Sequence, residues 1–253
     1  YNQPALSYSY NSKLYDSTYG GVIICDTPSG KITTLDFSDC QFISNSASSG
    51  GVIATCNSVA NIKNCVFYNS SADRFGGAIY SLKSNLTIQD SYFEQNDAKY
   101  GGVIFANSSN LNLKDSNFNL SQAYCFGGVI ASFLSQLDVN HVLFNDYASL
   151  EDAGGAIYGI RGTLNVVDSS FMDGRSDFGG AICNLMSNST ISDSKFINNT
   201  ATYYGGSIYN MYGNIVLTRD NFANSHADSG GSIFNRLSSL DRKSGSAGMP
   251  RPI

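Results

Sequence analysis

The stretch FGGAIY, residues 75–80, joins a glycine pair to an isoleucine one residue further on, and this arrangement occurs nine times. The first glycines of the nine copies are 25 to 30 residues apart, at Gly20, Gly50, Gly76, Gly101, Gly127, Gly154, Gly179, Gly205 and Gly230. An unbroken period of this length is typical of a solenoid, in which each unit contacts only its neighbours. The 253 residues therefore predict one repeat domain over residues 1–240, with a partial first coil at 8–19.

A second column consists of phenylalanines that follow the first glycine by 17 residues, or by 22 in the first copy. These residues are Phe42, Phe67, Phe93, Phe118, Phe144, Phe171, Phe196 and Phe222. Mostly aliphatic residues five and seven positions before each phenylalanine form one face of a strand, and a polar turn follows them. Three short strands per repeat predict an all-β parallel β-helix of nine to ten coils, each about 4.8 Å from the next.

Composition narrows the classes of partner. The net charge of -5 leaves no basic stripe for nucleic acid, and no apolar run is long enough to span a membrane. Residues 241–253 depart from every repeat column, which indicates a linker or an expression remnant. The two histidines, His141 and His226, are more than three coils apart, so a histidine-based metal site or catalytic triad is not expected.

With these columns in place, the sequence resembles the polymorphic outer membrane protein repeats and adhesin-like β-helix proteins, whose pattern pairs GGA[ILV] with FxxN. The first motif is literal as GGAI at 76, 154 and 179, and the second occurs as FISN at 42–45, FEQN at 93–96 and FINN at 196–199. The resemblance covers about residues 8–240. It implies a right-handed parallel β-helix displayed outside the cell, acting without catalysis or cofactor.

We therefore expect a non-enzymatic, extracellular cell-surface protein that presents its faces to a glycan or a protein. The first alternative is a structural rod or filament subunit that associates with copies of itself. The second is a polysaccharide lyase or glycosidase, because the same fold can carry catalysis. Its acids would come from the long corner at 145–153, where Asp146, Glu151 and Asp152 cluster.

The residue after the isoleucine that recurs in every repeat should face outward by strand alternation. In five coils it is aromatic: Tyr80, Phe105, Tyr158, Tyr209 and Phe234. We call these five residues the aromatic ladder. An exposed ladder of this kind can stack on sugar rings or pack against a second rod, and the alternative is a stack that only stabilises the sheet face. We expect the ladder to be the ligand-binding face.

A polar column three positions before each phenylalanine is rich in aspartate. It reads Asp39, Asn64, Asp90, Asp115, His141, Asp168, Asp193 and Arg219. Stacked carboxylates could bind calcium or act as the acids of a lyase. We interpret the column as repeated turn chemistry, because the repeat alone explains its spacing. The sequence therefore predicts no catalytic residue and no metal ligand.

Three further features concern covalent links and hydrogen bonding. Cys40 and Cys65 stack on adjacent coils and are candidates for a disulfide, with two buried free thiols as the alternative. Asn184, Asn210 and Asn235 should form an amide ladder between coils. Six sequons permit N-glycosylation, at Asn69, Asn85, Asn107, Asn119, Asn188 and Asn198.

Overall fold

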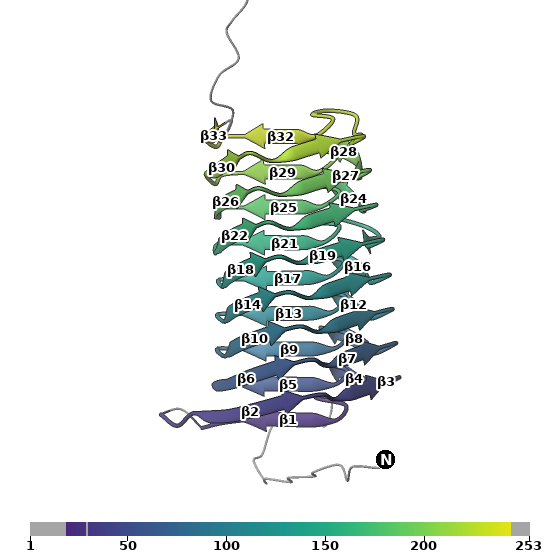
Figure 1. The fold of residues 1–253 in the computed structure, drawn as a ribbon, viewed down its shortest axis with the longest axis vertical. Coiled ribbons are helices and arrows are strands. Elements are labelled where there is room, and N and C mark those ends of the chain that lie inside the picture. The colour runs from purple at the N-terminus through teal and green to yellow at the C-terminus, as the bar shows by residue number, and fades with distance from the viewer. Residues whose placement is uncertain (1–18, 29, 244–253) are drawn as a thin grey trace, which may run out of the picture.

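The computed structural model describes residues 19–28 and 30–243, and these residues contain strands and turns without a helix. The strands coil into a rod of about eight turns, in which every strand pairs in parallel with its equivalents one repeat away. Figure 1 shows the successive turns stacked in chain order from β1 to β32. The predicted parallel β-helix is confirmed. The predicted partial coil at 8–19 lies almost wholly outside the described residues, which partly explains the lower number of turns.

Four sheets run along the rod, where the sequence predicted three. The first sheet follows the glycine pairs and comprises β1 (Ile23–Asp26), β5 (Ile53–Cys56), β9 (Ile79–Leu82), β13 (Ile104–Asn107), β17 (Ile130–Phe133), β21 (Ile157–Ile160), β25 (Ile182–Leu185), β29 (Ile208–Met211) and β32 (Ile233–Arg236). The second comprises β2 (Thr33–Ser38), β6 (Ser58–Lys63), β10 (Asn85–Gln89), β14 (Asn110–Lys114), β18 (Gln136–Asn140), β22 (Thr163–Val167), β26 (Asn188–Ser192), β30 (Ile215–Thr218) and β33 (Leu240–Lys243).

The third and fourth sheets have shorter strands. The third contains the phenylalanine column and comprises β3 (Gln41–Ile43), β7 (Val66–Tyr68), β11 (Tyr92–Glu94), β15 (Asn117–Asn119), β19 (Leu143–Asn145), β23 (Ser170–Met172), β27 (Lys195–Ile197) and β31 (Asn221–Ala223). The fourth, which the sequence analysis missed, comprises β4 (Ser46–Ser49), β8 (Ser71–Phe75), β12 (Asp97–Tyr100), β16 (Gln122–Phe126), β20 (Ala148–Ser149), β24 (Arg175–Phe178) and β28 (Thr200–Tyr204). Its inward column is small, as at Ala72 and Ala123, so it has no strong hydrophobic signal.

Left-handed residues form the corners between the sheets. In one coil the corner residues Gly76, Lys83, Asp90 and Gln95 have φ angles of 62°, 49°, 51° and 55°. The second glycine of the pair has a different role, because a Cβ on Gly77 would collide with the carbonyl oxygens of Gly102 and Asp97. At this corner the first glycine thus supplies the positive φ, and the second leaves room for the backbone of the next coil.

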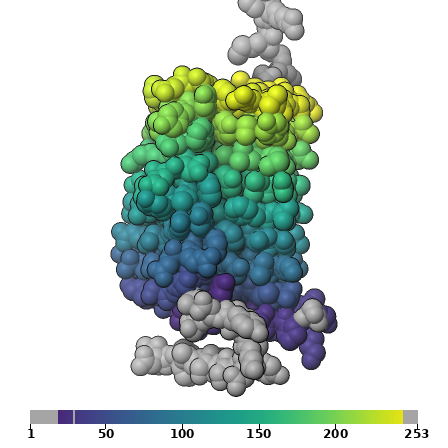
Figure 2. Space-filling model, turned by 180° about the vertical axis from the view of Figure 1, so that it is seen from behind, coloured from purple at the N-terminus to yellow at the C-terminus, as the bar shows by residue number. Residues whose placement is uncertain are grey.

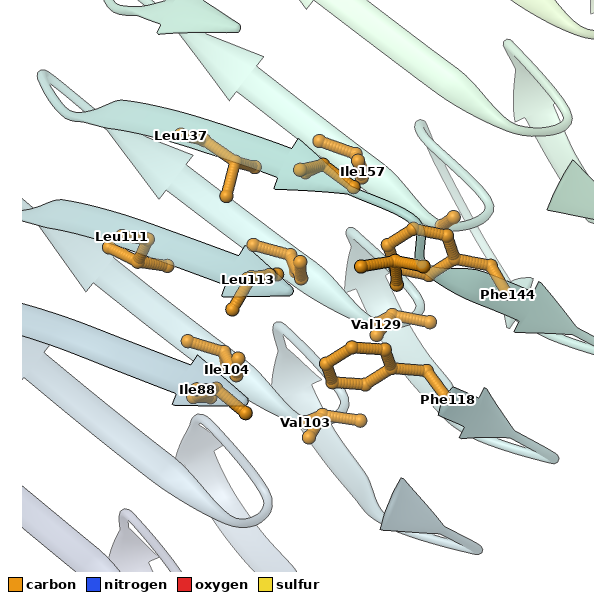
Figure 3. Close-up of a cluster of buried hydrophobic side chains, with 14 of the residues drawn as sticks. Ile88, Val103, Ile104, Leu111, Leu113, Phe118, Val129, Leu137, Phe144 and Ile157 are labelled. Atoms are coloured by element: carbon orange, nitrogen blue, oxygen red, sulfur yellow. The ribbon is translucent and has the colours of Figure 1, made fainter. Parts of the chain in front are cut away.

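The core is a set of stacked columns that fill the inside of the coil. The phenylalanine rings of adjacent coils lie 4.5 to 5.2 Å apart between centroids and within 27° of parallel. Figure 3 shows Phe118 and Phe144 in this stack. Val103 and Val129, each of which directly follows the glycine pair of its coil, lie beside them. Serines turn inward at the corners, where the Ser84 and Ser109 amides donate to the next coil's Ser109 and Ser135 hydroxyls at 3.2 and 3.0 Å. Polar corners and apolar strands therefore both repeat with the coil.

Candidate functional site: the outer aromatic surface

The aromatic ladder lies on the outward side of the first sheet, but most of its rings are covered. Phe105, Tyr158 and Tyr209 are only 7%, 6% and 9% exposed, and Tyr80 and Phe234 are half-buried. The predicted exposure is therefore wrong for the first three residues. Burial also raises the pKa values of the Tyr80, Tyr158 and Tyr209 hydroxyls above that of an exposed tyrosine.

A second aromatic column covers the ladder. It consists of the residues immediately before the glycine pairs, and we call it the covering column: Tyr19, Phe75, Tyr100, Phe126, Phe178 and Tyr204. Its rings pack on ladder rings, with centroid distances of 4.4 Å for Phe75 and Phe105 and 4.6 Å for Phe126 and Tyr158. This column was not predicted, although an aromatic residue precedes six of the nine glycine pairs.

Ladder rings also stack on one another and on side chains at the ends of their own strands. Tyr80 stacks on Phe105 at 5.7 Å, and Tyr209 stacks on Phe234 at 5.6 Å, each pair within 9° of parallel. The strand-end side chains Phe133, Ile160, Leu185 and Met211 pack against the same cluster. The faces of these rings are thus occupied by other side chains of the same rod.

Exposed apolar side chains lie next to this cluster, at the left-handed corner that follows the first sheet. We call them the apolar ridge: Leu134, Met186, Tyr212 and Leu237, with exposed fractions of 58%, 43%, 55% and 65% and φ angles of 51°, 49°, 58° and 52°. Bulky side chains are unfavourable at positive φ, where glycine, asparagine and aspartate are preferred. Earlier coils have Asn57, Lys83 and Ser108 at the same corner. The ridge is therefore confined to the C-terminal half of the rod.

Comparison with family models adds to this geometry. The model for the right-handed β-helix region matches residues 20–171. The chain belongs to the right-handed β-helix family. The model for the Chlamydia polymorphic membrane protein repeat matches residues 193–211, and the two matches together support the predicted polymorphic outer membrane protein-like repeat family.

The repeat match indicates a surface-associated protein and gives no positive sign of enzymatic activity. Searches among curated proteins and among solved structures gave no match. Within the described part of the chain, no helix has the length and apolar character needed to cross a bilayer. The comparisons thus establish the fold family, and the repeat match is the one finding that indicates a surface association.

The acidic corner of this β-helix gives each carboxylate a different neighbour. Arg175 pairs with Asp146 at 3.2 Å, and the Tyr124 hydroxyl donates to Glu151. Asp152 is half-buried, and burial raises the pKa of its carboxyl, with a smaller contribution from the charge of Asp177. Among residues 19–28 and 30–243, no group of three histidine, cysteine or acidic side chains is arranged to hold a metal ion. Two of the three predicted acids, Asp146 and Glu151, are thus tied to the neighbouring side chains Arg175 and Tyr124.

The aspartate column of this β-helix has the conformation expected for turn chemistry. Asp39, Asp90, Asp115, Asp168 and Asp193 all have φ between 46° and 56°. Several members bond to the equivalent residue one coil away, as His141 Nδ1 does to Asp115 at 2.8 Å and as Arg219 does to Asp193. These contacts lower the pKa values of the Asp115 and Asp193 carboxyls. Three pairs of this column, Asp39 with Asn64, Asp115 with His141 and Asp193 with Arg219, thus tie adjacent coils together.

Cysteines and sequons occupy several faces of the rod. All six cysteines are free thiols, and the Cys40 amide approaches Cys65 Sγ at 3.4 Å. The sequon asparagines Asn69, Asn85, Asn188 and Asn198 are exposed, whereas Asn107 and Asn119 are half-buried. The disulfide stays a prediction and concerns the first two coils. The glycosylation also stays a prediction and concerns the surface. Neither involves the aromatic cluster.

Proposed function

We propose that this chain is the recognition domain of an adhesin-like, extracellular surface protein. It acts without catalysis and binds a protein partner through the apolar ridge. The aromatic ladder and its covering column act as the rigid support beneath that ridge. This assigns the ladder an indirect role in binding, in place of the direct contact expected from the sequence.

The observation that carries the proposal is that the four ridge residues should destabilise the isolated rod, for two reasons. Each has a bulky side chain at a left-handed corner and leaves a large apolar fraction in water. A corner of the same geometry is occupied by Asn57 and Ser108 in earlier coils, so the fold does not require leucine, methionine or tyrosine there. Strained residues that serve no structural purpose are typical of binding sites.

The partner's chemistry follows from the side chains around the ridge. The ladder rings present few free faces, which disfavours sugar stacking and favours a protein with apolar side chains. From β17 to β32, the strand-end and corner columns contain two charged residues, Arg161 and Arg236. We therefore expect the partner to surround its apolar contact with acidic groups, because complementary charge orients and accelerates docking.

The test is a binding array that displays purified cell-surface proteins beside glycans. The variant replaces all four ridge residues with asparagine, which suits positive φ and removes the apolar surface. The matched control is Leu120→Asn, because Leu120 is also apolar, 41% exposed and left-handed, with φ 50°, but lies at a different corner. We expect the unsubstituted domain and the control to bind the same protein spots and the ridge variant to lose them.

Other outcomes would support the alternatives. Binding to glycans alone that survives the ridge substitutions would contradict the proposal and return the ladder to direct sugar contact. Light scattering that rises with concentration, together with an absence of array binding, would instead indicate a rod or filament subunit. Release of uronates or sugars from a polysaccharide would favour an enzyme.

A further inference from the structure

An amide ladder runs inside the C-terminal coils, at the inward position next to the aromatic ladder. Asn184 Nδ2 donates to Asn210 Oδ1, and Asn210 Nδ2 donates to Asn235 Oδ1, both at 2.6 Å. Each of the two Nδ2 groups also donates to the carbonyl three residues further on, at Ser187 and Gly213, at 2.9 Å. The predicted ladder is therefore confirmed. Every rung receives a hydrogen bond from the previous coil except the first.

The first rung is irregular because the preceding coil has Gly159 at this position, paired in register with Asn184. Asn184 Oδ1 is fully buried and accepts no hydrogen bond from the protein. A Cβ built on Gly159 would lie 3.8 Å from this oxygen and would contact no other atom within 4 Å. A buried carbonyl oxygen without a donor is costly, so the site favours a donor beside it.

A small cavity lies at this point between β17, β21 and β25. Most of its surface is apolar, from side chains such as Leu137 and Ile157, and Gly159 and Gly162 leave room for it. The polar residues of the lining are Ser132, Ser135, Thr163, Asn184 and Ser187. The volume open to the centre of a water-sized sphere is about 10 Å³, which is close to what one water molecule needs. Ser135 and Ser187 donate to the carbonyls of Phe133 and Leu185, and each already accepts one backbone amide, from Ser109 and Gly162. One lone pair is therefore left on each hydroxyl oxygen.

We propose that this cavity is a binding site for a single buried water molecule. The water donates one hydrogen to Asn184 Oδ1 and the other to a serine oxygen of the lining. It thereby acts as the missing rung at the start of the amide ladder, in place of a side chain that Gly159 does not supply. The proposal concerns the inside of the rod and is independent of the proposed function of its surface.

The direct test is a crystal structure at a resolution that shows ordered water, compared with the same structure for Gly159→Asn. We expect a density peak within hydrogen-bond distance of Asn184 Oδ1 in the unsubstituted protein. In the variant we expect the introduced amide to replace that peak, and to donate to Asn184 as Asn184 donates to Asn210. No peak at Asn184 Oδ1 in well-ordered density of the unsubstituted protein would overturn the proposal.

Thermal melting of two variants gives a second test. The backbone of Gly159 has no positive φ, so a side chain can be added without backbone strain. Gly159→Ala and Gly159→Asn both restrict the unfolded chain relative to glycine, but only asparagine supplies a donor to Asn184 Oδ1. We therefore expect the asparagine variant to melt about 2–4 °C above the alanine variant. Equal melting temperatures of the two variants would mean that Asn184 Oδ1 needs no donor, and the proposal would be wrong.

Discussion

The interior phenylalanine stack and the outer aromatic layer are two assemblies of rings on the same rod, and they differ in order. Interior rings such as Phe93 and Phe118 are fully buried and nearly parallel, at 4.7 Å and 10°. Outer rings are nearly parallel within the ladder, but the covering rings meet them at varied angles, 22° for Phe126 and Tyr158 and 45° for Phe75 and Phe105. The interior stack uses one residue per coil at one register position, so the coil itself sets its geometry. The outer layer combines two columns and is free to vary, which is where a binding surface can be built.

The largest expected effect is on the interior stack. Phe118→Ala removes a fully buried ring between Phe93 and Phe144 and should lower the free energy of unfolding by about 3–5 kcal/mol. The cost is high because rings on both sides hold the cavity open. Denaturant unfolding of the variant measures it. A midpoint equal to that of the unsubstituted protein would mean that this column is not the core.

Cross-linking tests how closely the inner columns stay in register. Cys40 and Cys65 occupy the same inward position in adjacent coils, and the Cys40 amide lies 3.4 Å from Cys65 Sγ. We expect oxidised glutathione to take two electrons from the two thiols, which then form a disulfide. Each oxidised glutathione becomes two molecules of reduced glutathione, which carry the two thiol protons. Such a bridge should stabilise the first coils by about 2–4 kcal/mol.

Non-reducing peptide mass spectrometry before and after oxidation detects the bridge. Cys183 serves as a built-in control, since its register partners in the adjacent coils are Tyr158 and Tyr209, so no thiol lies in register beside it. A mixed pattern in which Cys40 pairs as often with Cys25 or Cys56 as with Cys65 would show that the first coils do not hold the predicted register.

A substitution in the outer layer should cost less than one in the core. Phe126 is half-buried, packs on Tyr158 at 4.6 Å and lies 5.5 Å from Tyr100. We expect Phe126→Ala to lower the free energy of unfolding by about 1–2 kcal/mol, because solvent already reaches part of the ring. The measurement is the same denaturant series. A cost equal to that of Phe118→Ala would remove the distinction between the two layers.

Sequence reasoning succeeded where the position of a residue depends on the repeat alone. The phenylalanine column, the glycine corners and the amide ladder each follow from one residue type at one place per coil. The exposure of the aromatic ladder was wrong because alternation along a strand gives the direction of Tyr158 and not what lies outside it. Phe126 covers Tyr158 from the preceding repeat, across a glycine pair. The fourth sheet was missed because its inward residues, such as Ala72, are too small to show a period.

The side-chain pairs of the aspartate column should contribute less to stability than either aromatic layer, and only above a certain pH. Arg219 lowers the pKa of the Asp193 carboxyl, so this pair stabilises the folded rod at pH values above the usual aspartate pKa. The contribution should disappear as the pH falls through the lowered pKa, since Asp193 is then protonated in both the folded and the unfolded chain. Asp193→Asn should accordingly melt below the unsubstituted protein at pH 7 and together with it near pH 2. A difference that persists at the lower pH would have another cause.

The smallest effect is expected at the apolar ridge, and its sign is opposite. Leu134 is 58% exposed and left-handed, with φ 51°. Leu134→Asn relieves backbone strain and removes little buried apolar area, so it should raise the free energy of unfolding by about 0.5–1 kcal/mol. Leu120→Asn should do the same at its own corner, so thermal melting alone cannot separate the two leucines. Partner binding can separate them. If both variants gain stability but only Leu134→Asn loses binding, the rod retains a strained leucine at position 134 for recognition.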